Sequence, residues 1–201
     1  MNFTKTAGKY NIPCLSPVKS IDDNVEFMPF NFVKTSKDYT KGVHFFIDDY
    51  QFNRLWTKPD VYCKILKDFK YVLSPDFSLY ADIPYVMQLW KHYQKQWFGC
   101  YMQKQGIEVI PTIGWADERS FKFCFEGIPK HSVVAVSSVG TQANRESKEL
   151  FQKGFKRAMR VLKPTQVVFF GKLPEWIDSS VNIRHIPHYF DVKFKNMKYG
   201  R

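Results

Sequence analysis

The strongest constraint on the fold is a pattern that recurs along most of the chain: a short apolar segment, a polar or Gly/Pro-containing turn, and an amphipathic segment. Its clearest copy is Tyr71–Tyr80, in which an apolar run ends at a Ser-Pro pair. A carboxylate, Asp76, and a hydroxyl, Ser78, follow directly, and a helical segment is predicted behind them. This order is typical of parallel α/β proteins, whose ligands bind where the carboxyl ends of the strands meet.

The same pattern predicts the other elements. Strands are expected at Val25–Phe32, Val43–Ile47, Tyr71–Leu73, Ile107–Ile110, His131–Val136, Gln166–Phe170 and Ile183–Tyr189. Helices are expected at Phe52–Leu66 with a break near Pro59, at Asp82–Gln105 with Asp82 as N-cap, at Ser120–Glu126 and at Asn144–Leu162. Strands that alternate with helices predict right-handed parallel crossovers and a sheet covered on both faces.

Two architectures of the α/β class fit this order. One is a small or incomplete β/α barrel, and the other is an open doubly wound sheet. A complete β/α barrel takes about 250 residues, whereas this chain has 201. A similar turn after each strand favours the incomplete barrel. We expect a single domain over residues 1–201, with 1–40 as an N-terminal arm and 190–201 as a basic C-terminal tail.

The net charge indicates the kind of partner, and the cysteine usage indicates the cellular location. The 30 Lys and Arg residues exceed the 19 Asp and Glu residues, which gives a net charge of +11. Such an excess favours a polyanion, and nucleic acid is the expected partner. The four cysteines form no C-x-x-C pair, no export leader is apparent, and no apolar run approaches the length of a membrane helix. We therefore expect reduced thiols, a cytoplasmic location and no membrane contact.

Polar side chains follow most of the predicted strands, and a parallel sheet would gather them at one edge. The candidate catalytic groups are the carboxylates of Asp48, Asp49, Asp76, Asp117 and Glu118. The candidate substrate-binding groups are Ser78, Trp115, Arg119, Ser137, Ser138 and Lys172, with Trp115 as a stacking platform. For the two serines and Lys172, ordinary turn chemistry is the favoured interpretation.

These carboxylates permit more than one chemistry. Two of them about 5 to 9 Å apart could act as acid and base at a glycosidic or N-glycosidic bond. Three could instead hold Mg²⁺, the cofactor that such a site would take, for phosphodiester cleavage. Asp49 and Asp117 also lie where helix N-caps are expected, and Asp76 could form an Asx turn. No site for a structural metal is predicted, because the two histidines at 185 and 188 lack further ligands.

Two predicted helices carry the basic residues that suit a nucleic-acid backbone. The candidate nucleic-acid-binding residues are Lys91, Lys95, Lys153, Lys156, Arg157 and Arg160. The alternative is that these lysines form a solvated face while Trp90, Trp97, Phe98 and Tyr101 form a buried stripe.

Three segments also carry a family resemblance: Gly42–Phe52, Leu73–Tyr80 and Ile110–Ser120. Through these segments the chain resembles a bacterial and phage family known as domain of unknown function 4417. The resemblance extends from about Gly42 to Lys172. The resemblance implies a phage or mobile-element setting and supplies no catalytic residues.

Function therefore stays open between two classes. The first is a protein that acts on nucleic acid as a carboxylate-dependent hydrolase or transferase, at an N-glycosidic or a phosphodiester bond. The second is a non-catalytic module that binds nucleic acid or a host or phage protein, as a replication accessory or an inhibitor of host defence. A nucleotide-sequestering protein is a variant of the second class. The sequence predicts no oligomeric state.

Overall fold

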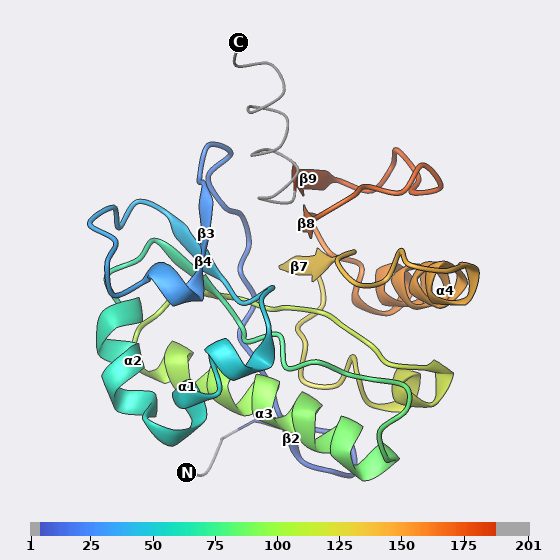
Figure 1. Ribbon diagram of the computed structural model, residues 1–201, viewed down its shortest axis with the longest axis horizontal. Coiled ribbons are helices and arrows are strands. Elements are labelled where there is room, and N and C mark those ends of the chain that lie inside the picture. The colour runs from blue at the N-terminus through green and yellow to red at the C-terminus, as the bar shows by residue number, and fades with distance from the viewer. Residues whose placement is uncertain (1–4, 188–201) are drawn as a thin grey trace.

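The computed structural model describes residues 5–187, and its main feature is a set of parallel strands in chain order (Figure 1). The parallel strands are β3 (Phe27–Pro29), β4 (Gly42–His44), β5 (Tyr71–Leu73), β6 (Val109–Ile110), β7 (Val133–Ser137), β8 (Gln166–Phe170) and β9 (Ile183–Ile186). A small antiparallel pair, β1 (Thr6–Ala7) and β2 (Ile12–Pro13), precedes them.

The strands form two hydrogen-bonded groups, β3–β6 and β7–β9, that meet at one parallel bridge between Thr112 and Ala135. Ala135 N–H donates to Pro111 O at 2.8 Å, and Ile113 N–H donates to Ala135 O at 2.8 Å. Each strand therefore lies beside its neighbour in the sequence, as in a barrel. The predicted α/β class with parallel strands is confirmed.

The barrel is not closed. In the described part of the chain, no strand pairing joins β9 to β3. Side chains bridge this gap instead: the Arg184 guanidinium donates to the carbonyls of Asp22 and Val25. The rings of Phe27 and Phe170 pack edge to face with centroids 5.5 Å apart. The sheet is thus open and barrel-like, in keeping with a chain too short for a complete barrel.

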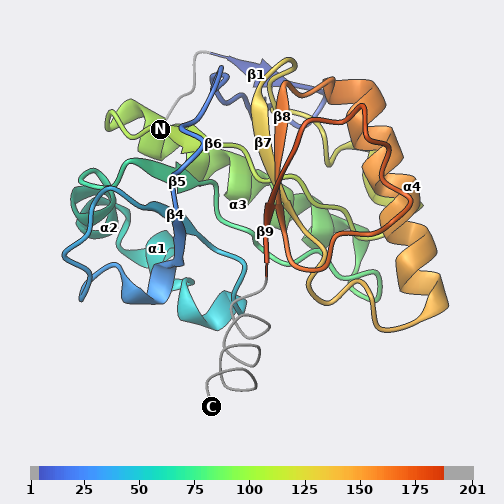
Figure 2. The same cartoon turned by 90° about the horizontal axis from the view of Figure 1, so that it is seen from above.

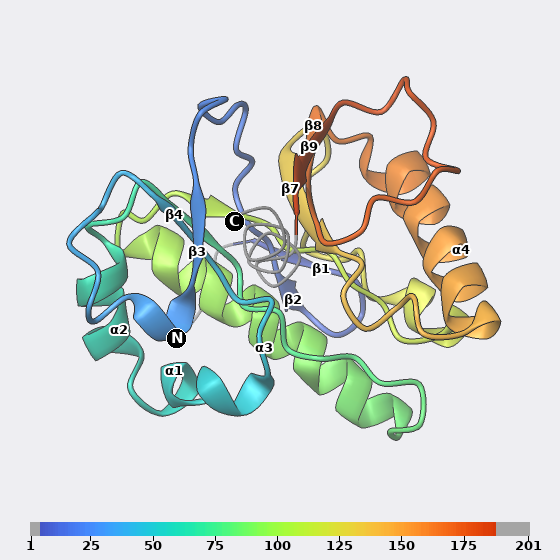
Figure 3. The ribbon, with the colours of Figure 1, turned by 45° about the horizontal axis from the view of Figure 1, so that its top comes forward.

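Helices flank the two halves of the sheet separately. They are α1 (Arg54–Thr57), α2 (Pro59–Leu66), α3 (Tyr85–Lys104) and α4 (Arg145–Leu162), with 3₁₀ turns η1 (Phe30–Phe32), η2 (Asp49–Gln51) and η3 (Glu118–Lys122). Figures 2 and 3 show α4 on the side of β7–β9 that faces away from α1 and α2. No helix among residues 5–187 is long and apolar enough to cross a membrane.

The expected start of the longest helix is wrong by two residues. Asp82 was the predicted N-cap, but α3 begins at Tyr85 and its N-cap is Pro84, whose backbone is extended (ψ 143°). Proline disfavours helical geometry in the residue before it, so Ile83 cannot join the helix. Two other elements agree: Asn144 caps α4 by accepting from Ser147 N–H at 2.8 Å, and β8 covers the residues predicted for it. The strands β3 and β4 are shorter than predicted, and the segment predicted as a helix from Ser120 is the 3₁₀ turn η3.

Two apolar clusters stabilise this arrangement, and β7 and β8 contribute to both. Val133, Ala135, Val168 and Phe170 pack with the cluster that includes β4 and β5. The alternate residues of the same strands, such as Phe169, pack with α4 in the second cluster. Because side chains of a strand alternate between its faces, these five-residue strands have apolar residues on both sides.

Gly154 in α4 determines how closely that helix approaches the turn after β6. A Cβ at this position would lie 2.1 Å from Cε2 of Trp115. We predict that Gly154→Ala lowers the free energy of unfolding by about 1–3 kcal/mol through overpacking, although alanine alone favours a helix. Urea denaturation measures the change. Lys148→Ala, on the exposed part of α4, is the control and should change it little; equal or greater stability of Gly154→Ala would contradict the packing argument.

Candidate functional site

The turns after β4 and β5 meet at the carboxyl edge of the sheet, where they bring Asp49 and Ser78 together. The Ser78 N–H and hydroxyl donate to Asp49 Oδ1 at 3.1 and 2.8 Å. From α3, Lys91 Nζ donates to Asp49 Oδ2 at 3.0 Å. The interpretation of Asp49 as a helix N-cap is therefore wrong: Asp48 occupies the N-cap of η2, and neither the cap nor the turn uses the Asp49 carboxylate.

Asp76 lies beside this pair, in the same turn as Ser78. Its carboxylate is partly exposed. Desolvation raises the pKa of Asp76 to about 6, against a lowering effect of the nearby Lys95 charge, while Asp49 raises it further. Near neutral pH this carboxylate can therefore exchange a proton readily, which an ordinary aspartate cannot.

Lys95 reaches the same place from α3 and was not expected there. Its side chain is fully buried, and its Nζ has no hydrogen-bond partner among the described residues. Burial lowers the pKa of Lys95, and the nearby carboxylate of Asp76 opposes that effect. The prediction that Lys95 belongs to an exposed nucleic-acid-binding surface is wrong, because no part of it reaches solvent.

Gly114, in the turn after β6, leaves a space between these two groups. A Cβ on Gly114 would lie 3.5 Å from Nζ of Lys95 and 3.6 Å from Oδ1 of Asp76. Lys95 and Asp76 therefore both border the position that a side chain at residue 114 would occupy. Four elements position the site: the turns after β4, β5 and β6, and α3.

The inward face of α3 is polar throughout this region. Gln88, His92 and Gln96 follow one another at four-residue spacing and are fully buried, as is Lys95. His92 Nε2 lies 2.9 Å from Glu126 O, and burial lowers the pKa of His92 to about 3, so the ring is neutral. Within the described chain, His92 Nδ1 and both amide atoms of Gln96 are unpartnered. Buried polar atoms without partners are rare in folded proteins, and their concentration here marks a site.

The predicted groups of the β6 turn have local roles. The Asp117 carboxylate caps η3, accepting from Arg119 N–H at 2.8 Å and Ser120 N–H at 3.2 Å, and it pairs with the Arg119 guanidinium at 2.6 Å. Partial burial acts to raise the pKa of Asp117, but these hydrogen bonds hold it below its usual range. The N-cap interpretation of Asp117 is confirmed. Glu118 pairs with Lys153 at 2.7 Å, where both side chains are exposed.

Trp115 is not a free stacking platform. Its ring packs over Gly154 and lies 5.4 Å from the ring of Phe151, both in α4. That prediction is wrong because the residue after Gly114 points into the second apolar cluster. Asp48 is exposed and makes no side-chain capping bond.

The third predicted group, after β7 and β8, uses its hydroxyls within the turns. The buried Ser138 hydroxyl donates to Lys172 O at 2.8 Å, and Ser137 Oγ accepts from Val139 N–H at 3.1 Å. The Lys172 side chain itself is exposed. The structure therefore brings these three residues together, and their hydrogen bonds are those of ordinary turns. None of these bonds reaches Asp49 or Asp76.

The exposed face of α4 carries the remaining basic residues. Lys156, Arg157 and Arg160 are exposed and form no ion pair with an acidic residue of the described chain. Lys153 also lies on this face, where it forms an ion pair with Glu118. Lys91, in contrast, is held by Asp49 and is largely covered.

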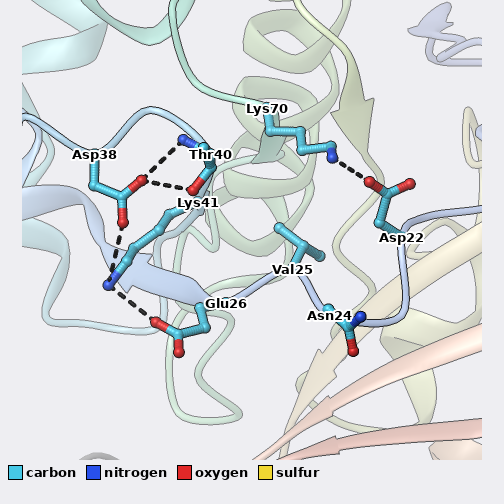
Figure 4. A pocket seen from close by; sticks show the side chains of 8 residues that line it. All are labelled: Asp22, Asn24, Val25, Glu26, Asp38, Thr40, Lys41 and Lys70. Carbon is cyan, nitrogen blue, oxygen red and sulfur yellow. Dashed lines mark hydrogen bonds and ion pairs between the residues drawn. The ribbon is translucent and has the colours of Figure 1, made fainter.

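A cavity of about 370 Å³ lies at the opposite edge of the sheet, before the strands begin (Figure 4). Its lining consists of Asp22, Asn24, Val25, Glu26, Asp38, Thr40, Lys41 and Lys70. The charges pair internally: Lys41 Nζ lies 3.0 Å from Glu26, and Lys70 pairs with Asp22. We locate the candidate site at the Asp76 edge, because the unpartnered buried groups are there.

The side chains at the Asp76 edge do not fit a metal centre. Among residues 5–187, no group of three or more His, Cys, Asp or Glu side chains is placed to hold a metal ion. Asp49 and Asp76 lie near each other without a third ligand, while Asp117 is bound to Arg119 and Asp49 to Lys91.

Comparison with known proteins gives the family. Residues 4–189 match the domain of unknown function DUF4417. The Gene 1 protein of Mycobacterium phage L5 is 34% identical over 200 residues, covering 95% of this chain and 84% of the relative. The Gene 1 protein of Mycobacterium phage D29 is 32% identical over 199 residues, covering 98% and 73%. No solved structure matches the chain. The chain therefore belongs to the DUF4417 family, as its three long motifs suggested.

Proposed function

We propose that this protein acts on nucleic acid and cleaves an N-glycosidic bond at the Asp76 site. The observation that carries the proposal is a partly exposed carboxylate with a pKa of about 6, next to a small space that Gly114 leaves open at the carboxyl edge of parallel strands. Ligands of such sheets bind at this edge. The phage setting of the relatives agrees with a nucleic-acid substrate but does not specify one.

The proposed chemistry needs one group that activates water or stabilises positive charge on the sugar. Above about pH 6 the Asp76 carboxylate is ionised and can do either, by taking a proton from water or by lying against the developing oxocarbenium ion. Asp49 is the second carboxylate. Three hydrogen bonds, two from Ser78 and one from Lys91, fix the orientation of the Asp49 carboxylate. In this proposal Asp49 orients the sugar relative to Asp76.

Nucleic-acid binding is assigned to the exposed face of α4. Lys156, Arg157 and Arg160 project from one side of this helix without acidic partners in the described chain. Basic side chains on one helix face neutralise phosphates and bind without sequence preference. Metal-dependent phosphodiester cleavage is less well supported than N-glycosidic cleavage, because no three carboxylate, His or Cys ligands gather in the described chain.

A base-release assay tests the proposal. Single-stranded and double-stranded DNA and RNA, and free nucleotides, are incubated with the protein, and free bases are quantified by chromatography. We expect release from at least one polymer, with a rate that rises as pH passes through about 6, because Asp76 must lose its proton to act. Binding without release from any polymer or nucleotide would contradict the enzyme and favour the non-catalytic binding module.

A further inference from the structure

Lys95 has no role in the cleavage step described above, yet its position is unusual. It is fully buried, its amine has no hydrogen-bond partner among the residues described, and it faces the space beside Gly114. A lysine kept only for structure normally pairs with a carboxylate or carbonyl when buried. Here the nearest carboxylate, Asp76, lies beyond ion-pair distance, since no such pair joins them.

We propose that Lys95 forms a covalent imine with the aldehyde of a ring-opened sugar, the abasic product of the proposed reaction. The substrate assignment rests on the proposed function, whereas the nucleophile is inferred from the burial and isolation of the amine. A desolvated lysine in an enclosed site is the usual form of an imine-forming nucleophile.

The step balances without a co-reactant. The neutral amine of Lys95 attacks the aldehyde carbon, the carbon–oxygen double bond becomes a carbinolamine, and loss of one water gives a protonated imine. Asp76 is placed to supply the proton that leaves with the water, since both groups border the space at Gly114. No atom is oxidised or reduced. Hydrolysis reverses the sequence and returns the free amine.

The low-polarity surroundings support this role. Burial lowers the pKa of Lys95, which increases the fraction of neutral amine near neutral pH. His92 is neutral as well, because burial lowers its pKa to about 3, so it adds no positive charge to the site. The other groups whose charge acts on the amine are the carboxylate of Asp49 and the buried thiol of Cys124, and burial raises the pKa of that thiol to about 12. Of the two groups that border the space at Gly114, Asp76 is half-buried and Lys95 is fully buried.

Borohydride trapping tests the imine directly. The full-length protein is mixed with an oligonucleotide that already contains an abasic site, sodium borohydride is added, and the adduct is detected by electrophoresis and mapped by mass spectrometry. We expect a borohydride-dependent adduct on the peptide that contains Lys95. No adduct, or an adduct confined to another lysine such as Lys91, would overturn the proposal.

Two variants complete the test. Lys95→Met keeps an unbranched side chain without the amine, and trapping should fall to background. Lys64→Met removes an exposed lysine of α2 and should leave trapping unchanged. Circular dichroism shows whether Lys95→Met is folded, and the mapped site in the unmodified protein decides the question if it is not.

The two proposals fail separately. A preformed abasic site bypasses base removal, so trapping can succeed even if the protein releases no base. Conversely, base release with no adduct at Lys95 leaves the N-glycosidic reaction standing and eliminates the imine.

Discussion

Replacing Asp76 with Asn should reduce base release by about 10²- to 10⁴-fold, the usual contribution of a positioned general acid–base group. The substitution keeps the size of the side chain and removes its charge and its proton-accepting oxygen. Because the carboxylate must be ionised to act, the residual activity of Asp76→Asn should also lose the rise of rate near pH 6 that we expect for the unmodified protein.

The same variant should be more stable than the parent at neutral pH. The folded-state pKa of Asp76 is about 6 and its ordinary value is 3.8, so between these values the folded protein binds more protons than the unfolded chain. Asp76 therefore makes stability fall as pH rises from about 4 to about 6. Asp76→Asn removes this penalty. We expect a gain of about 1–2 kcal/mol at pH 7, reduced for partial exposure, and almost none at pH 4.

Urea denaturation at both pH values, together with the base-release assay, separates the outcomes. Asp68→Asn, at an exposed carboxylate after α2, is the matched control and should change neither quantity. Lost activity with raised stability is the pattern of a functional residue held in an unfavourable environment. Full activity of Asp76→Asn would rule out the proposed role, and lower stability at pH 7 would show that the carboxylate is structural.

The parts of the fold that were predictable are those in which one periodicity dominates. Gln166–Phe170 is a run of apolar residues between turns, and its strand has the predicted bounds. Asn144 precedes an amphipathic segment, and it caps α4. Local pattern fixes such elements because strand and helix periodicities differ. The open gap between β9 and β3 depends on contacts across the whole chain, which local pattern does not encode.

The candidate site was only half predictable. Asp49, Asp76 and Ser78 follow strands, so the parallel order places them at one edge. The burial of Lys95 is not predictable from the apolar stripe of its helix, because that stripe predicts the aromatic side as the buried one. In α3 the polarity is partly reversed: Trp90 is 47% exposed, whereas Gln88 is fully buried.

A usable signal was nevertheless present in α3. Gln88, His92 and Gln96 repeat at four-residue spacing with Lys95 beside them, which places four polar residues on one face of the helix. The outer rings support each other instead: Trp56 of α1 packs against Trp90 and Trp97 with centroids 5.5 and 5.0 Å apart. A polar inward face with an aromatic outer face indicates a site rather than a core.

The second large effect is expected from the basic face of α4. Replacing Lys156, Arg157 and Arg160 together with Glu should weaken nucleic-acid binding by about 10³-fold or more at low salt, because each lost phosphate contact also loses its counterion release. The slope of log affinity against log salt concentration should become less steep by about 3, one for each removed contact. Fluorescence anisotropy with a labelled oligonucleotide measures both quantities.

A control with the same change in net charge makes this result specific. Lys58, Lys64 and Lys67 are exposed around α2, on the other side of the molecule from α4 (Figure 3), and their replacement by Glu should weaken binding far less. If both triple variants lose affinity equally, the net charge of +11 and not the α4 face is responsible. If the α4 variant abolishes binding while Asp76→Asn leaves function in the phage or host cell intact, the protein is a binding module and its carboxylate site is not catalytic.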